Sequence, residues 1–228
     1  MTRGARSDDP MTQSASANRP IGLNTPVGDF LNAAAAKQPT PGGGSVTALV
    51  GALAASMGEM TVNYSVGKKG LEAYQNELRP ALAELTRARL LLLGLMTEDQ
   101  AAFETVTAIR KLPEPDATRA DRFNAALLAC IRIPETMAAT AVAILEVVDR
   151  ITNFVNPHLL SDLAVCADLA MATARCAIYS VRANLPDVKD PADRASIEST
   201  IASVMTHAAK LIQRVAPRIW ERHEQTAS

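Results

Sequence analysis

The sequence has few aromatic residues, few cysteines and no excess of either charge. Phenylalanine, tryptophan and tyrosine make up 4% of the 228 residues, although 48% are hydrophobic. The apolar content is therefore mainly alanine, leucine, valine and isoleucine, a mixture that favours closely packed helices over a β-sandwich. Because 23 basic residues accompany 24 acidic ones, nothing indicates a basic surface for a polyanion, and we expect no nucleic-acid partner.

The three cysteines form no metal or disulfide motif. Cys130, Cys166 and Cys176 are odd in number and include no Cys-x-x-Cys pair, which argues against a disulfide framework or a zinc site. The three histidines are equally scattered. We therefore expect buried thiols in a reducing cytoplasm and no bound metal.

No segment has the features of a membrane span or a secretory signal. The best candidate, Val46 to Val62, is interrupted by Glu59 and is shorter than the roughly 20 residues that a span needs. Residues 1–20 are polar and lack the apolar stretch of a signal peptide. The sequence predicts a disordered tail over 1–20, one helical domain over 21–228, and a cytoplasmic protein with no membrane partner.

Proline and glycine divide the chain into six predicted helices. Thr25 and Pro26 have the pattern of a cap followed by a first helical residue. Pro80 predicts a kink or a restart, and Pro134 an internal kink. The helices are expected over about 25–36, 45–66, 71–111, 117–150, 158–183 and 192–222. With no strand-like alternation and no repeat, this predicts an all-α, single-domain, up-and-down bundle with long kinked helices.

A glycine-rich turn, Gly42-Gly43-Gly44-Ser45, precedes the second helix. Small residues then share one face of that helix, at Gly44, Ala48, Gly51, Ala52, Ala55 and Gly58. Small side chains let another backbone approach, so we expect this helix to be central and buried. Its N-terminal N–H groups suit an anion or a carbonyl oxygen, and a tight turn capped by Ser45 is an equally good interpretation. Neither a Walker A loop nor a dinucleotide fingerprint fits the surrounding residues.

Three carboxylates fall on faces where apolar side chains belong. Asp99 is in line with Leu92 and Met96, Asp162 shares a face with apolar residues of the fifth helix, and Glu59 lies among alanines and valines. Burial without a cation would raise the pKa of such a carboxyl toward the range useful for proton transfer. The structural alternatives are that Asp162 caps its helix and that Asp99 pairs with an arginine.

Lys68 and Lys69 directly follow the small-residue helix. One interpretation is a solvated turn whose positive charge favours the helix C-terminus. The other is a cationic rim for the acidic tail of a ligand.

Together these segments resemble the cyclodeaminase/cyclohydrolase family of folate one-carbon enzymes. That family includes the cyclodeaminase domain of formiminotransferase-cyclodeaminase and free-standing methenyltetrahydrofolate cyclohydrolases. The resemblance extends from about Thr25 to Trp220, and its strongest element is Pro39 to Ser45 with the helix that follows. The other elements, in chain order, are Asn63 with Val66-Gly67-Lys68-Lys69, Glu98-Asp99 with Ala102-Phe103, Leu112-Pro113, Pro134, Asn156 before Ser161-Asp162, and Asn184-Leu185.

The resemblance implies an all-α homodimer that binds a reduced folate, including polyglutamylated forms, in a cleft. It implies no metal and no cofactor beyond the tetrahydrofolate substrate. Asp162 matches the family's acid/base residue, and Asp99 is the second catalytic candidate. The substrate-binding positions that it implies are Gly42, Gly43, Gly44, Ser45, Asn63, Lys68, Lys69, Asn156 and Asn184. The chain departs from the family pattern at Glu59, Ser180, Asn153–Pro157 and Gly70-Leu71.

The implied reaction is hydrolysis of 5,10-methenyltetrahydrofolate to 10-formyltetrahydrofolate, which needs a base for water and an acid for the departing nitrogen. The alternative is formimidoyltetrahydrofolate cyclodeaminase, in which N10 attacks the formimino carbon and ammonia leaves. The lack of a formiminotransferase region favours the cyclohydrolase. A catalytically silent dimer that binds folate or a protein partner is a second alternative, suggested by the departures at Glu59 and Ser180.

Overall fold

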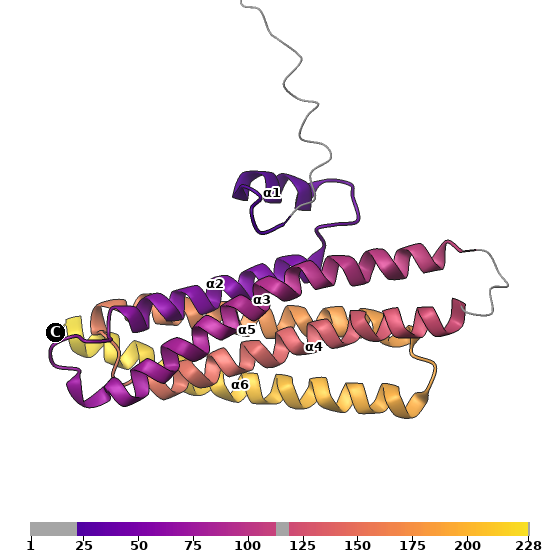
Figure 1. Ribbon diagram of the computed structural model, residues 1–228. Coiled ribbons are helices and arrows are strands. Elements are labelled where there is room, and N and C mark those ends of the chain that lie inside the picture. The colour runs from indigo at the N-terminus through magenta and orange to yellow at the C-terminus, as the bar shows by residue number, and fades with distance from the viewer. Residues whose placement is uncertain (1–21, 113–118, 228) are drawn as a thin grey trace, which may run out of the picture.

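A computed structural model describes residues 22–112 and 119–227, and in these residues it contains helices and no strand (Figure 1). This confirms the predicted all-α fold. The predicted tail over 1–20 lies outside the described residues. The α-helices are α1 (Val27–Ala35), α2 (Gly43–Asn63), α3 (Gln75–Arg110), α4 (Arg119–Ile151), α5 (Leu160–Asn184) and α6 (Pro191–Ala227), with 3₁₀ turns η2 (Glu72–Tyr74), η3 (Pro157–Leu159) and η4 (Leu185–Asp187).

Five of these helices run side by side, up and down, as the bundle (Figure 1). Helix α2 packs between α3 and α5, α4 packs on α3 and α5, and α6 covers α4 and α5. Helix α1 stands apart from the others (Figure 1), and Phe30 is its only buried residue. The connections are short, as expected for antiparallel neighbours in a bundle.

Helix α2 is central because most residues on its inner face are glycine or alanine. A Cβ added to Gly51 would lie 2.9 Å from Cγ2 of Thr173 on α5 and 3.0 Å from Cδ1 of Leu92 on α3. A Cβ added to Gly58 would lie 3.1 Å from both Cys166 and Leu85. The two glycines therefore allow three helices to approach closely, which confirms the prediction of a central, buried helix.

Several predicted helix starts were wrong. Helix α2 begins at Gly43, with Gly42 as its N-cap and no side-chain cap, so Ser45 is not the cap. The cap of α1 is Pro26, because the Thr25 hydroxyl instead accepts a hydrogen bond from the Gly22 N–H. Helix α3 continues through Pro80, so of the two predicted alternatives, a kink and a restart, the restart was wrong.

Three segments are long and apolar enough to cross a bilayer, judged by length and composition alone. They are α2, α4 and the stretch from Pro157 to Asp187, and 56%, 56% and 50% of their most apolar windows are buried inside the fold. The absence of a membrane span stays a prediction.

Candidate functional site

Asp99 lies against the N-terminus of α2. The Ser45 hydroxyl donates a hydrogen bond of 3.3 Å to Oδ2 of Asp99. Burial raises the pKa of Asp99 above its ordinary value of 3.8, and hydrogen bonds from the hydroxyl and the backbone of Ser45 partly oppose this shift. The alternative that Asp99 pairs with an arginine was wrong, because its partner among the described residues is Ser45. A carboxyl that keeps its proton to a higher pH is suited to proton transfer.

Gly44 makes room for this carboxylate. A Cβ at position 44 would lie 2.1 Å from Oδ1 of Asp99, whereas a Cβ at Gly43 would meet nothing within 4 Å. A Cβ at Gly42 would make only an ordinary contact, 3.6 Å from the Pro39 carbonyl oxygen. Of the three adjacent glycines, Gly44 is therefore the one that the packing of Asp99 requires. The sequence could not reveal this, because it depends on α3.

Cys130 of α4 and Asn184 of α5 lie in the same half of the bundle as Asp99. Burial raises the pKa of the Cys130 thiol, and the negative charge of Asp99 raises it further. The Asn184 side-chain amide donates to the carbonyl oxygens of Cys130 (3.3 Å) and Ser180 (2.9 Å). Asn184 therefore ties the end of α5 to α4.

Lys68 and Asn156 form a second group beyond the other end of α2. Lys68 Nζ donates a 2.6 Å hydrogen bond to Oδ1 of Asn156, which also accepts from the His158 N–H at 3.2 Å. The backbone N–H of Asn156 donates to the Ser65 hydroxyl at 2.8 Å, and Asn156 is 6% exposed. Asn156 thus holds the half-buried Lys68 in place and leaves two of its three ammonium hydrogens for other partners.

Residues that the sequence analysis missed support the loop before Asn156. Arg222 of α6 donates to the carbonyl oxygens of Thr152 (2.5 Å) and Val155 (2.6 Å), and burial lowers the pKa of its guanidinium. Tyr74 stacks on Phe154, with ring centroids 4.9 Å apart. Two segments distant in sequence, η2 and α6, therefore fix this loop, which no local pattern could have indicated.

The remaining predicted residues lie at this same end. Asp162 is half-buried in the first turn of α5. That helix has Leu159 as its N-cap and no side-chain cap, so the capping alternative for Asp162 was wrong. Asn63 and Lys69 are exposed.

The predicted site residues thus fall into two groups, at opposite ends of α2 and of α5. Gly44 and Asn63 are about 28 Å apart along α2, and Asp162 and Asn184 about 33 Å apart along α5, at 1.5 Å per residue. The Asp99 group comprises Gly42, Gly43, Gly44, Ser45, Asp99 and Asn184, and the Lys68 group comprises Asn63, Lys68, Lys69, Asn156 and Asp162. The chain by itself does not bring the two groups together.

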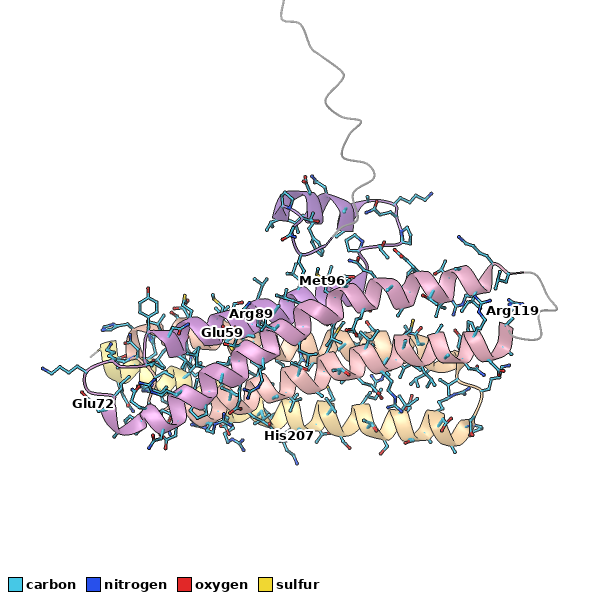
Figure 2. The ribbon with its side chains drawn as sticks, viewed as in Figure 1. Glu59, Glu72, Arg89, Met96, Arg119 and His207 are labelled. Carbon is cyan, nitrogen blue, oxygen red and sulfur yellow. The ribbon has the colours of Figure 1, made fainter. Side chains whose placement is uncertain are left out.

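Glu59, the main departure from the family pattern, has a structural partner. Arg89 Nε lies 2.6 Å from its Oε1, and the Thr86 hydroxyl donates to its Oε2 at 3.0 Å. Figure 2 shows Glu59 and Arg89 side by side on α2 and α3. Glu59 therefore joins these two helices, which offsets the unfavourable burial of its charge.

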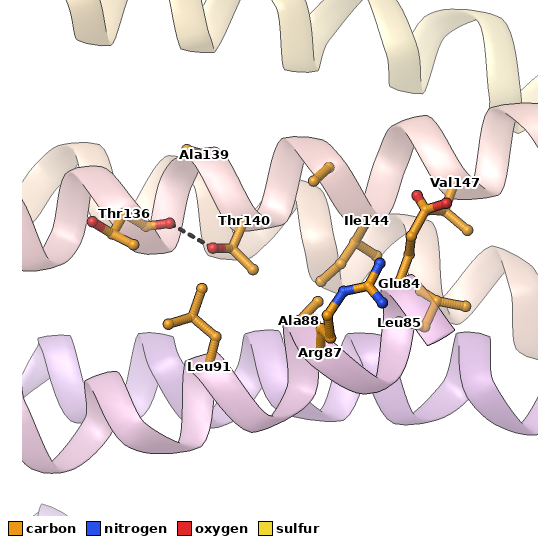
Figure 3. Close-up of a pocket in the computed structure, with 11 residues that line it drawn as sticks. Glu84, Leu85, Arg87, Ala88, Leu91, Thr136, Ala139, Thr140, Ile144 and Val147 are labelled. Carbon is orange, nitrogen blue, oxygen red and sulfur yellow. Dashed lines mark hydrogen bonds between the residues drawn. The ribbon is translucent and has the colours of Figure 1, made fainter. Parts of the chain in front are cut away.

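A cleft of about 400 Å³ lies between α3 and α4 (Figure 3). Leu85, Ala88, Leu91 and Ile144 give it an apolar wall, and the Thr140 hydroxyl at its edge donates to a carbonyl oxygen of its own helix. None of the predicted site residues lines it. In the part of the chain that the structure describes, no cluster of three or more His, Cys, Asp or Glu side chains could hold a metal ion.

Comparison with known proteins decides the family. The family model described as formiminotransferase-cyclodeaminase matches residues 26–203. The chain belongs to this family. It is 26% identical over 196 residues to the methenyltetrahydrofolate cyclohydrolase of Methylorubrum extorquens, covering 84% of this chain and 94% of that protein.

Two further relatives show how the family is built. The chain is 28% identical over 204 residues to the formimidoyltransferase-cyclodeaminase of Sus scrofa, covering 86% of this chain but only 38% of that longer protein. The crystal structure of formiminotetrahydrofolate cyclodeaminase from Thermotoga maritima superposes with a TM-score of 0.76 at 25% identity, covering 90% of this chain and 98% of the other. The predicted family and the bundle fold are both confirmed.

Proposed function

We propose that this family member is a folate one-carbon enzyme that hydrolyses 5,10-methenyltetrahydrofolate to 10-formyltetrahydrofolate. The observation that carries the proposal is the similarity to the Methylorubrum extorquens cyclohydrolase, which extends over 94% of that protein. The fold offers carboxylates for proton transfer at both ends of α2, and we expect the reaction to need no metal and no cofactor besides the folate.

Two carboxylates are suited to the proton transfers of this reaction. A base takes a proton from the water that attacks the methenyl carbon, and an acid returns a proton to the ring nitrogen as the C–N bond breaks. Burial of Asp99 raises its pKa, which fits the acid. Asp162 is partly open to solvent, which fits the base that activates water, and it is the residue that the family resemblance assigns to acid/base chemistry.

Lys68 is the residue best placed to bind the folate's acidic tail. Its ammonium is half-buried and held by Asn156 at 2.6 Å, so little side-chain entropy is lost when a carboxylate binds. Lys69 is exposed beside it and adds positive charge to the same rim. This arrangement favours a polyglutamylated reduced folate as the substrate.

The cyclodeaminase reaction is the second candidate, and one observation favours it. The Thermotoga maritima cyclodeaminase is matched over 98% of its own chain. A chain of this length is therefore compatible with either reaction. The lack of a formiminotransferase region, which was expected to favour the cyclohydrolase, does not distinguish the two reactions. Both reactions pass through a tetrahedral carbon and need the same kind of proton transfer.

Two assays on the purified protein separate the candidates. The absorbance of methenyltetrahydrofolate should fall faster with protein than in buffer if the chain is a cyclohydrolase. Ammonia release from 5-formimidoyltetrahydrofolate, with no accelerated hydrolysis of the methenyl compound, would favour the cyclodeaminase. Folate binding with neither reaction would favour the catalytically silent dimer and reject our proposal.

A further inference from the structure

Arg222 of α6 holds the loop that joins α4 to η3. Its Nη1 donates a hydrogen bond of 2.5 Å to the carbonyl oxygen of Thr152, and its Nη2 donates one of 2.6 Å to the carbonyl oxygen of Val155. Thr152 and Val155 are both fully buried, and buried carbonyl groups require a hydrogen-bond donor. One guanidinium therefore supplies donors to two points of this loop.

The second of these bonds fixes the peptide group that carries Asn156. The carbonyl of Val155 and the N–H of Asn156 belong to one planar peptide unit, in which they point in opposite directions. Arg222 binds the carbonyl oxygen at 2.6 Å, and the hydroxyl of Ser65, just after α2, accepts a hydrogen bond from the N–H at 2.8 Å. Because the peptide unit is held on both sides, the direction of the Asn156 side chain is set.

Asn156 in turn sets the position of the Lys68 ammonium. Its Oδ1 accepts a hydrogen bond of 2.6 Å from Lys68 Nζ, and its Nδ2 donates to the Tyr64 carbonyl oxygen at 3.5 Å. The amide is uncharged, so it holds Lys68 without neutralising it. The neighbouring Lys69 is exposed, and a lysine that is free in solvent loses more rotamer freedom when it binds an anion.

The partners of Arg222 differ from those of two other arginines of α6. Arg214 and Arg218 both bind the Asp149 carboxylate, which is a partner of opposite charge. Arg222 binds two uncharged carbonyl oxygens, and burial lowers the pKa of its guanidinium. Because removing a charge from water is unfavourable unless a counter-charge offsets it, stability alone does not account for an arginine at this position.

We infer that Arg222 is a positioning residue of the candidate substrate site, which holds Asn156 through the Val155–Asn156 peptide group and thereby keeps the Lys68 ammonium ready to bind the acidic tail of the folate. The identity of that ligand rests on the proposed function. The inference extends the site to the C-terminal part of α6, beyond residue 203, where the match to the family model ends. Arg222 itself need not touch the substrate.

The first experiment measures KM and kcat for polyglutamylated methenyltetrahydrofolate. Arg222→Met removes the donors, and KM should rise several-fold with kcat little changed, which is the pattern of lost substrate binding. Arg218→Met is the matched control, because Arg218 lies one turn earlier on α6 and binds the side chain and the carbonyl oxygen of Asp149. It should leave KM unchanged.

An unchanged KM for Arg222→Met, or an equal rise for Arg218→Met, would overturn the inference. If Arg222→Met does not fold, Arg222→Lys takes its place. Its single nitrogen cannot reproduce the two-nitrogen fork that binds both carbonyl groups, and the same two outcomes decide.

The second experiment tests whether Arg222 acts through Lys68. In a double-mutant cycle, two residues that act through one interaction have effects that do not add. Arg222→Met should therefore raise KM little further in a chain that already carries Lys68→Met, and by its full factor in a chain that carries Lys69→Met. Equal factors in the two backgrounds would show that Arg222 does not act through Lys68, and the inference would fail.

A third measurement separates failure of the inference from failure of the proposed function. Lysines are dimethylated with ¹³C-formaldehyde, which leaves one N–H on each, and the Lys68 signal in the carbon NMR spectrum is assigned by its loss in Lys68→Arg. This signal should lie apart from those of exposed lysines in the wild type and in Arg218→Met, and should join them in Arg222→Met.

If the wild type acts on no folate but the Lys68 signal moves in this way, the proposed function is wrong and the positioning of Lys68 by Arg222 holds. If the signal is the same in the wild type and in Arg222→Met, the positioning is wrong whatever the activity.

Discussion

Gly44 and Asp99 share a space that has no room for a methyl group. A Cβ at position 44 would lie 2.1 Å from Oδ1 and 2.4 Å from Oδ2 of Asp99. The absence of a side chain on α2 therefore sets the position of a carboxylate on α3. This contact explains why a glycine must occupy the third position of the Gly42–Gly44 turn.

We expect Gly44→Ala to destabilise the protein by about 1–3 kcal/mol, as overpacking of a close contact does, and to lower turnover by displacing Asp99. Urea denaturation and steady-state kinetics measure the two effects. Gly43→Ala is the control, because its new Cβ meets nothing within 4 Å, and it should be neutral or slightly stabilising. Equal effects of the two substitutions would contradict the assigned role of Gly44.

Asp99 should make stability depend on pH. Because burial raises its pKa above 3.8, its favourable contribution is complete below the unfolded-state pKa and is lost as pH rises through the folded-state pKa. Asp99→Asn removes the buried charge, so it should raise the melting temperature more at pH 7 than at pH 4.

Calorimetry at the two pH values measures this difference. Asp168→Asn, at an exposed position on α5, serves as the control and should change little at either pH. A melting temperature for Asp99→Asn that is below the wild-type value at pH 7 would show that the ionised carboxylate is stabilising.

The Glu59–Arg89 ion pair should contribute to stability and not to catalysis. The Glu59 side chain is 14% exposed and its partner 32%, so Glu59→Ala should cost about 1–3 kcal/mol by leaving the Arg89 guanidinium without its acceptor. The double variant Glu59→Ala/Arg89→Ala should recover part of that loss, while turnover per folded molecule stays at the wild-type value.

A surface pair provides the comparison. Glu84 pairs with Arg150 at 37% and 45% exposure, and Glu84→Ala should lose no more than about 1 kcal/mol. A large fall in turnover for Glu59→Ala at full folding would indicate that Glu59 acts in the site after all.

Lys68 should set the affinity for the substrate's acidic tail. Lys68→Met is expected to raise KM several-fold for a polyglutamylated folate and less for a monoglutamate, with kcat little changed. Added salt should raise the wild-type KM in the same direction, because it screens the attraction. Lys210→Met on α6 is the charge-matched control, and a KM for the wild type that does not respond to salt would count against a charged rim.

Local sequence patterns predicted the helices well and the site only in part. The spacing of alanine and glycine identified α2 as the central helix, because the close approach of neighbouring helices depends on the side chains along α2 itself. Helix starts were less certain, because Ser45 resembles a cap and in fact donates its hydroxyl to Asp99. The function of Gly44, the anchoring of Lys68 by Asn156 and the support from Arg222 depend on contacts between distant segments, which no local pattern contains.

The separation of the site residues is the clearest example. The order of Asp99, Asn156, Asp162 and Asn184 along the chain agreed with one family motif set and predicted a single cleft. The length of the helices separates these residues into two groups, because the two ends of α2, like those of α5, lie about 30 Å apart.

The most direct test of the account is the rate at which methenyltetrahydrofolate absorbance decays with wild-type protein, with Asp99→Asn and with Asp162→Asn. We expect the wild type to accelerate the decay clearly over buffer and both variants to lose most of that acceleration, with all three proteins folded. Decay no faster than in buffer with the wild type, or wild-type rates in either variant, would contradict it.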